Sequence, residues 1–204
     1  MTDISLDRFW QIARKSRLVP ERELTEFLED VQRQPEDRRP STAKEAADRL
    51  VHQGLLNRWQ ADNLLQGKYK GFSLGKYTLL GHLGTGGMSS VYLAKHPVME
   101  RLVAVKVLPK RYVENQNYLD RFRREARAAA SLDHPNIVRA FDIDQDGETH
   151  YIVMEYVDGR DLQQLVREMG PLAPQMAADY IAQAAMGLDH AHEAGLIHRD
   201  IKPA

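Results

Sequence analysis

Apolar side chains recur every three or four residues through the first part of the chain, which is the spacing of an amphipathic helix. One such stripe runs from Leu6 to Ala13, and another runs from Leu24 to Val31. Pro20, which lies between them, suits the first turn of a helix because proline lacks the amide hydrogen that this turn leaves unpaired. The pattern therefore predicts two short helices near the amino terminus.

The next segments carry their own start and stop signals. After the charged stretch 32–42, Thr42 and Glu45 have the spacing of a capping box, and Gly54 ends the helix that they begin. A fourth helix is expected from Asn57 to Gly67, and no internal repeat is apparent. We interpret residues 1–68 as a helical region and residues 69–76 as a linker. The helical region is either a domain that docks a partner or an inert solubilising extension, and the sequence leaves both open.

From residue 77 the apolar positions alternate instead of following the helical period, and alternation predicts strands. The expected strands are 77–83, 91–96, 102–108, 137–143 and 151–157, with one helix at 117–131 between the third and the fourth. Helical spacing then returns in two stripes at 162–169 and 177–191. The second part of the chain should therefore be a sheet with one helix, followed by further helices.

Composition and charge narrow the classes of function. The apolar content of 43% is enough for a packed core, and the formal charge of −1 offers no overall attraction to nucleic acid or to an anionic membrane. Nucleic acid is therefore not an expected partner. The absence of cysteine excludes disulfides and thiolate metal sites, and it fits a reducing cytoplasm. No signal peptide and no membrane span are expected within these residues.

Glycines gather in the turn between the first two expected strands. In LGTGGMSSV, the glycines at positions 84, 86 and 87 let the backbone come close to a ligand and turn its amides toward it, as a phosphate chain requires. A glycine-rich hairpin is also a common tight turn. This motif taken alone leaves both interpretations open.

A lysine lies in the middle of the third expected strand. Lys106 is flanked by Val105 and Val107, whose side chains point to the opposite face of the sheet. A lysine on a covered face needs a partner because desolvating an unpaired ammonium costs several kcal/mol. Glu125 in the following helix can supply it. In the alternative, Lys106 holds its ammonium in water and Glu125 is a solvated helix charge.

The order of these features carries more weight than any one of them. A glycine loop, a strand lysine, a helix glutamate and the motif HRD at 198–200 follow one another along the chain. In this order the chain resembles the protein kinase family, specifically the bacterial eukaryote-like (Hanks-type) serine/threonine kinases. The resemblance covers residues 77–204. It implies an α+β protein-kinase-like fold, with a complete small lobe of five antiparallel strands plus helix C and only the start of the helical large lobe.

The resemblance also implies a nucleotide site and a catalytic group. Asp200 would be the catalytic base, Lys202 would steady the transferred phosphoryl group, and Lys106 paired with Glu125 would hold the ATP phosphates. The positions implied to bind ATP are Leu83, Gly84, Thr85, Gly86, Gly87, Val91, Ala104, Lys106, Met154, Glu155, Val157 and Asp161. Mg²⁺ is the second implied cofactor. The family's metal ligands, an Asn and the Asp of a DFG motif, are expected beyond residue 204, so no metal ligand is assigned within the chain.

The implied activity is transfer of the γ-phosphoryl group of ATP to a serine or threonine of a protein substrate, because Lys202 completes the D-x-K-P pattern of serine/threonine members. Without the Asn, the DFG and the rest of the large lobe, we expect the 204 residues alone to bind ATP poorly and not to turn it over, and either to aggregate or to hold only a molten remnant of the large lobe. The alternative is a non-catalytic module that binds a nucleotide or docks a partner. A cytoplasmic catalytic part is expected, while a membrane span beyond residue 204 and dimerisation stay open.

Overall fold

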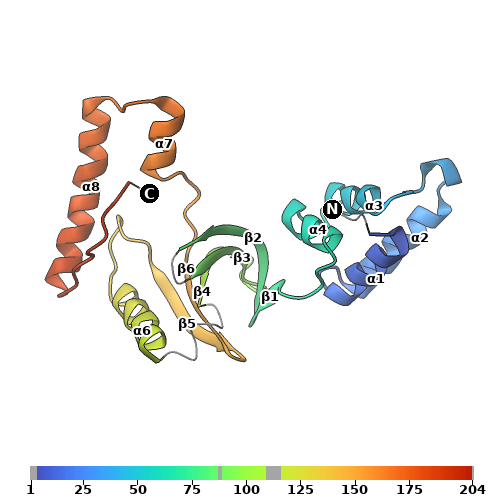
Figure 1. The fold of residues 1–204 in the computed structure, drawn as a ribbon, viewed down its shortest axis with the longest axis horizontal. Helices are drawn as coiled ribbons and strands as arrows, with labels where there is room; N and C mark the ends of the chain where they lie inside the picture. The colour runs from blue at the N-terminus through green and yellow to red at the C-terminus, as the bar shows by residue number, and fades with distance from the viewer. Residues whose placement is uncertain (1–3, 87–88, 109–115, 204) are drawn as a thin grey trace. The chain divides into compact units, whose positions relative to one another are not determined.

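The computed structural model describes the chain except for residues 1–3, 87–88, 109–115 and 204 (Figure 1). The side chains of residues 116, 121 and 125 also lie outside the description. The chain divides into two compact units. One comprises Met1–Leu83 with Tyr92–Arg101, and the other comprises Gly84–Val91 with Leu102–Ala204.

Four α-helices form the start of the first unit, as the apolar stripes predict (Figure 1). They are α1 (Leu6–Ser16), α2 (Glu21–Arg33), α3 (Ala43–His52) and α4 (Arg58–Leu65), with a short 3-10 turn at Glu36–Arg38. Each helix turns its apolar stripe inward, and the fully buried core includes Phe9, Ile12, Leu24, Leu50 and Leu64. Burial of these stripes is the main source of helix stability, because helices this short are marginal alone in water.

The expected capping box of α3 forms with a different partner. Thr42 accepts a hydrogen bond from the amide of Glu45 at 3.2 Å, but the Glu45 carboxylate accepts most closely from the amide of Ser41, at 2.7 Å. Hydrogen bonds from Ser41 hold the pKa of Glu45 below its ordinary value. A complete capping box occurs instead at α4, where Asn57 and Gln60 cap each other's backbone amides.

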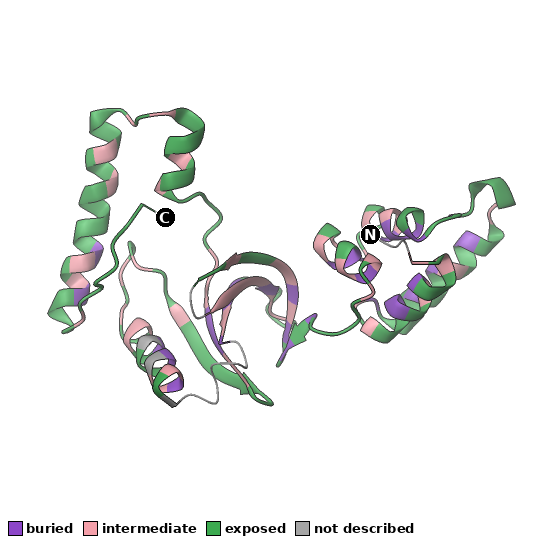
Figure 2. Ribbon diagram, viewed as in Figure 1, coloured by how far each residue is buried: buried purple, intermediate pink, exposed green. Residues whose placement is uncertain are grey.

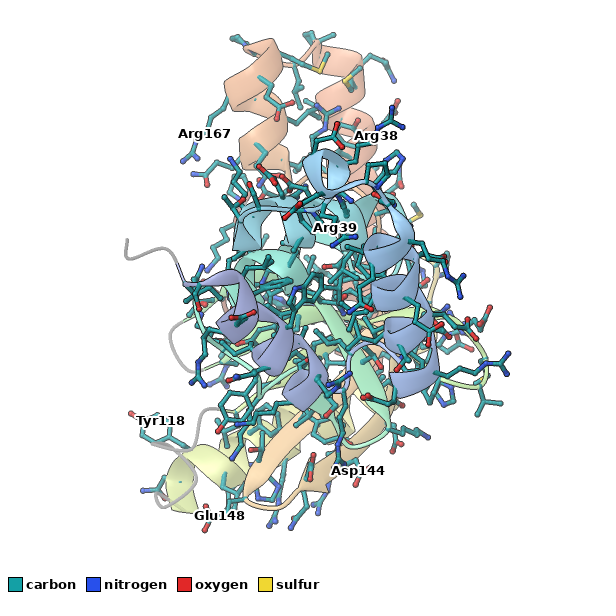
Figure 3. The ribbon with its side chains drawn as sticks, turned by 90° about the vertical axis from the view of Figure 1, so that its right-hand side faces the viewer. Arg38, Arg39, Tyr118, Asp144, Glu148 and Arg167 are labelled. Carbon is teal, nitrogen blue, oxygen red and sulfur yellow. The ribbon has the colours of Figure 1, made fainter. Side chains whose placement is uncertain are left out.

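Arginines fix the loop between α2 and α3, where Figure 3 labels Arg38 and Arg39. The guanidinium of Arg39 donates to the carbonyls of Gln32 and Gln34 at 2.7 and 2.9 Å. Arg49 on α3 donates to the Gln34 side chain at 3.0 Å and to the carbonyl of Arg38. The last carbonyls of α2 therefore find partners in side chains once the helix has ended.

The segment 69–76, interpreted from the sequence as a linker, contains regular structure. Phe72 is buried in the helical core, and its ring meets that of Trp59 edge-on at 5.8 Å. β1 (Ser73–Leu74) follows at once and pairs with the start of β2. This segment therefore continues the packing of the helices into the sheet.

The five predicted strands are all present and antiparallel pairs join them, with β1 as a sixth. The others are β2 (Tyr77–Thr85), β3 (Ser90–Lys95), β4 (Leu102–Val107), β5 (Ala140–Asp146) and β6 (Thr149–Glu155), in the order β1-β2-β3-β4-β6-β5. β5 begins three residues later than predicted. The residues before it form a turn instead, which the amide of Ile137 closes on the carbonyl of His134 at 3.0 Å.

The sheet of the second unit has apolar residues on both faces. Leu108 and Ile152 pack with Phe122 and Ala126 of α6 (Gln116–Ala130) in one cluster. Successive side chains of a strand point to opposite faces, so Val105 is on the face away from α6, and it is fully buried. Burial of both faces explains why β4 reads as an almost continuous apolar run in the sequence.

Two helices, α7 (Leu162–Met169) and α8 (Pro174–Glu193), complete the second unit. Figure 2 shows both mainly in green, and α8 has buried positions only toward its end, at Gly187 and Ala191. Ile181 is 63% exposed and Met186 is 53% exposed. No helix among the described residues is long and apolar enough to cross a bilayer.

Candidate functional site

The glycine turn connects the end of β2 to β3. The amide of Gly86 donates to the carbonyl of Ser89 at 2.8 Å, while Gly87 lies outside the described residues. A Cβ added to Gly84 would meet nothing within 4 Å, and one added to Gly86 would make only an ordinary contact at 3.9 Å with Ser89. The described residues therefore leave space beside both glycines, which suits close approach of a ligand to the backbone.

Lys106 faces the side of the sheet that α6 covers. It lies directly opposite Ile152 on β6, and residues paired in this way share a face. Ile152 packs against Phe122 of α6, so Lys106 is on the face predicted from the sequence. The side chain of Glu125 lies outside the described residues, and its ion pair with Lys106 therefore stays a prediction.

Several of the positions implied to bind ATP lie near the end of β6 or opposite it on β4. Ala104 is buried and stands directly opposite Met154 in the ladder. The amide of Glu155 donates to the carbonyl of Arg139 at 2.9 Å, which fixes the start of the segment that follows β6. Val157 is exposed, as is Leu83 at the other end of the expected set.

The other positions implied to bind ATP lie on β3, at the end of β2 and just before α7. Val91 is half-buried on β3, and Thr85 approaches the hydroxyl of Ser90 at 3.4 Å. Asp161 is the N-cap of α7, where its carboxylate accepts from the amide of Gln164 at 2.7 Å. The sequence analysis missed this cap, although an aspartate immediately before an apolar helical stripe is a usual signal for one.

Asp200 and Lys202 are brought together in the segment that follows α8. The ammonium of Lys202 lies 2.9 Å from a carboxylate oxygen of Asp200. This hydrogen bond holds the pKa of Asp200 below its ordinary value, so the carboxylate is ionised at neutral pH. The preceding residue, Arg199, has a φ of 64°, a left-handed conformation that is uncommon outside glycine. Asp200 and Lys202 therefore lie on an irregular segment that contains one residue in the left-handed region.

The loop before β5 packs on α8 through contacts that the sequence analysis did not predict. The amide nitrogen of the Asn136 side chain donates to the Gln183 side chain at 3.3 Å, and the rings of His134 and His190 stack with their centroids 5.3 Å apart. Gly187 lies beneath this loop. A cavity of about 740 Å³ adjoins these elements, and Asp200 is one of its lining residues.

Replacing Gly187 with alanine is expected to destabilise the second unit by about 1 kcal/mol, because the cost of overpacking the loop contact, about 1–3 kcal/mol, exceeds the gain of about 0.5–1 kcal/mol that alanine brings inside a helix. The added Cβ would lie 3.1 Å from the carbonyl oxygen of Asn136 and 3.3 Å from Ile137. Urea unfolding followed by circular dichroism measures the effect. Gly159→Ala is the matched control, since a Cβ there would meet nothing within 4 Å. Equal unfolding midpoints for the two variants would contradict the prediction.

Comparison with known proteins supports the kinase-like order of these features. The family model described as "Protein kinase domain" matches residues 77–204. Over 129 residues the chain is 44% identical to the serine/threonine-protein kinase PrkC of Bacillus subtilis, covering 63% of this chain and 20% of that protein. It is 46% identical over 133 residues to PknB of Mycobacterium tuberculosis, covering 63% and 21%.

A solved structure agrees with the sequence comparisons. The PknI kinase domain of Mycobacterium tuberculosis superposes with a TM-score of 0.57 at 35% identity, over 65% of this chain and 53% of that chain. The chain spans about a fifth of the length of the curated relatives. The matched family model covers the whole segment from β2 onward, and the chain belongs to the protein kinase family, among relatives that are bacterial Hanks-type serine/threonine kinases.

Proposed function

We propose that the protein is an ATP-dependent serine/threonine kinase, which moves the γ-phosphoryl group of ATP to a serine or threonine hydroxyl of a protein substrate. The observation that supports it most directly is the ion pair of Asp200 with Lys202, at 2.9 Å, on the irregular segment after α8. The relatives named serine/threonine-protein kinases support this function.

The nucleotide is proposed to lie against the glycine turn and the β4–β6 ladder. Space beside Gly84 and Gly86 supports close approach of the phosphates, since among the described residues an added Cβ would meet nothing within 4 Å at Gly84 and only Ser89, from 3.9 Å, at Gly86. Lys106 would neutralise phosphate charge from the strand, and the ladder pair Ala104 and Met154 would contact the adenine ring. The phosphates and the adenine of ATP thus each have a partner of suitable chemistry.

Contacts are proposed for the nucleotide, but none of the described residues is assigned to Mg²⁺, the second implied cofactor. Mg²⁺ supplies charge neutralisation at the phosphates when bound, and it prefers carboxylate and carbonyl oxygens in octahedral geometry. Among the described residues no cluster of three or more His, Asp or Glu side chains could hold a metal. We therefore assign no ligand for the ion within the described residues.

The chemical step then depends on position and charge. The ionised carboxylate of Asp200 would accept the proton of the substrate hydroxyl as its oxygen forms a bond to the γ-phosphorus and the bond to the ADP oxygen breaks. Lys202, held beside that carboxylate, would place a positive charge near the phosphoryl oxygens. No covalent enzyme intermediate is needed, because positioning and electrostatics supply the catalysis.

Replacing Lys106 with methionine is the test of the proposed nucleotide site. We expect the dissociation constant for a fluorescent ATP analogue to rise by about tenfold or more in the full-length protein, because charge-assisted phosphate contacts are lost. Lys95→Met is the matched control. Lys95 lies on β3 and pairs with Glu100 at 3.4 Å, away from the proposed contacts. Equal affinity in the Lys106→Met variant and the unaltered protein would refute the site.

A further inference from the structure

The four helices of the first unit are two copies of one helix–turn–helix, offset by 37 residues. We call residues 5–33 the first helix pair and residues 42–66 the second helix pair. The N-caps of their opening helices, Ser5 and Thr42, each accept from the amide three residues later. The second helices start at Glu21 and Arg58, again 37 residues apart. The prediction of no internal repeat was therefore wrong.

The correspondence extends to the turn and to the core. Between the paired helices, Arg17 and Gly54 both have left-handed backbone conformations, with φ of 56° and 73°. Buried residues also coincide at the same offset, in the pairs Phe9 with Ala46, Ala13 with Leu50, Val19 with Leu56, Leu24 with Ala61 and Phe27 with Leu64. Almost no side chain is identical between the copies, which is why the sequence alone concealed the repeat.

Within the described residues, the second helix pair supplies the side-chain hydrogen bonds from the helices to the sheet. The side-chain nitrogen of Gln60 donates to the carbonyl of Leu79 at 3.0 Å, and that of Asn57 donates to the carbonyl of Leu80 at 2.8 Å. Both acceptors lie on β2, just past the two residues that pair with β1. Gln60 is 6% exposed and is the one buried polar side chain among the described residues. Its burial is consistent with a hydrogen bond that the fold depends on.

Each of these amides serves two elements at once. The side-chain oxygens of Asn57 and Gln60 accept from each other's backbone amides, at 2.8 and 3.1 Å, and so close the capping box of α4. The nitrogens of the same groups are thereby directed at β2. The start of α4 is thus locked to the strand by the same groups that begin the helix.

An aromatic contact adds to these hydrogen bonds. Trp59, between the two amides, lies edge-on to Tyr92 of β3 at 6.5 Å. Tyr92 in turn meets the ring of His82 on β2 at 5.3 Å. A row of rings therefore runs from α4 across β3 to β2, in the edge-to-face geometry that aromatic pairs prefer.

The first helix pair has none of these groups at its equivalent positions. Pro20, Arg22 and Glu23 stand where the second pair has Asn57, Trp59 and Gln60. Proline and glutamate carry no side-chain amide donor, and the exposed Arg22 pairs with Glu26 on its own helix at 2.8 Å. The docking chemistry belongs to one copy of the repeat only.

We propose that the second helix pair is a permanent intramolecular brace of strand β2, and that its partner is this chain's own sheet. The brace joins a helical region outside the matched kinase segment to the first strand inside it. It also covers part of a strand whose pairing with β1 is only two residues long. The proposal is independent of the proposed kinase activity.

The double variant Asn57→Asp with Gln60→Glu tests the brace selectively. Aspartate and glutamate keep the oxygens that close the capping box, and acidic groups suit the start of a helix. Both nitrogen donors to β2 are replaced by oxygens, which would face the carbonyls of Leu79 and Leu80. Gln11→Glu with Gln32→Glu is the charge-matched control, because both positions are exposed on the first helix pair.

Hydrogen exchange of the full chain, followed by mass spectrometry, is the measurement. In the double variant we expect the amides of residues 77–83 to exchange about tenfold faster or more, with the helices of the first pair unchanged and the control equal to the unaltered chain. Unchanged exchange at 77–83 would overturn the brace. If the amides of α4 also exchange faster in the double variant, the single Asn57→Asp variant is measured to separate loss of the brace from loss of the helix. Faster exchange in β2 with α4 intact supports the brace, and unchanged exchange in β2 overturns it.

Discussion

Replacing Asp200 with asparagine is expected to lower the phosphoryl-transfer turnover of the full-length protein by about 10²–10⁴-fold. Asparagine keeps the size of the side chain but carries no negative charge and cannot take the proton of the substrate hydroxyl. It also loses the ion pair with Lys202, which joins the two side chains at 2.9 Å. Transfer of radiolabelled phosphate from ATP to a serine-containing protein substrate measures the turnover.

Two comparisons make this result specific. The affinity for the ATP analogue should stay within about twofold in Asp200→Asn, because no nucleotide contact is assigned to this carboxylate, so KM for ATP is expected to hold while kcat falls. Asp189→Asn is the control, since Asp189 is an exposed carboxylate on α8. A turnover in Asp200→Asn equal to that of Asp189→Asn would remove Asp200 from the catalytic step.

Replacing Phe9 with alanine is expected to destabilise the helical part of the first unit by about 3–5 kcal/mol. Phe9 is completely buried at the centre of the helical core, and its ring meets that of Trp10 edge-on at 5.3 Å. Truncation removes both the buried apolar area and this ring contact, and it leaves a cavity. Urea unfolding followed by tryptophan fluorescence measures the change, because Trp10 packs against this core.

Two further variants serve as controls for the loss of stability in Phe9→Ala. Phe9→Leu should cost less than Phe9→Ala, because it retains most of the buried volume. Val98→Ala should shift stability by less than about 0.5 kcal/mol, since Val98 is 84% exposed. A midpoint for Phe9→Ala that matches Val98→Ala would mean that the helical core is not cooperative.

Secondary structure was predictable wherever one face of an element is buried. The helical stripe from Leu6 to Ala13 and the apolar run around Val105 both report burial directly, and the corresponding helix and strand were confirmed. The start of β5 was misplaced because Ile137 and Val138 are apolar residues of a turn and of the link that follows it. An apolar residue in a turn has the same identity as one in a strand, so the pattern cannot separate them.

The candidate site was predictable from the order of its motifs, whereas its contacts depend on residues far apart in the chain. The pairing of Lys202 with Asp200 is local, but the stacking of His134 on His190 joins segments that no spacing rule connects. Asn57 and Gln60 illustrate the same limit. Their oxygens gave the readable helix-start signal, and their nitrogens bind a strand about twenty residues later, at Leu79 and Leu80.

The proposed brace and the proposed phosphate turn share strand β2. β2 receives the hydrogen bonds of the second helix pair at Leu79 and Leu80, and the same strand continues to Gly84 and Thr85 of the proposed phosphate turn. A molecule that binds the helices and alters the strand would change the affinity for nucleotide, and thermodynamic reciprocity requires nucleotide to change the affinity for that molecule by the same factor. The helical region would then be an effector domain, and strand β2 would couple its binding of that molecule to the binding of nucleotide.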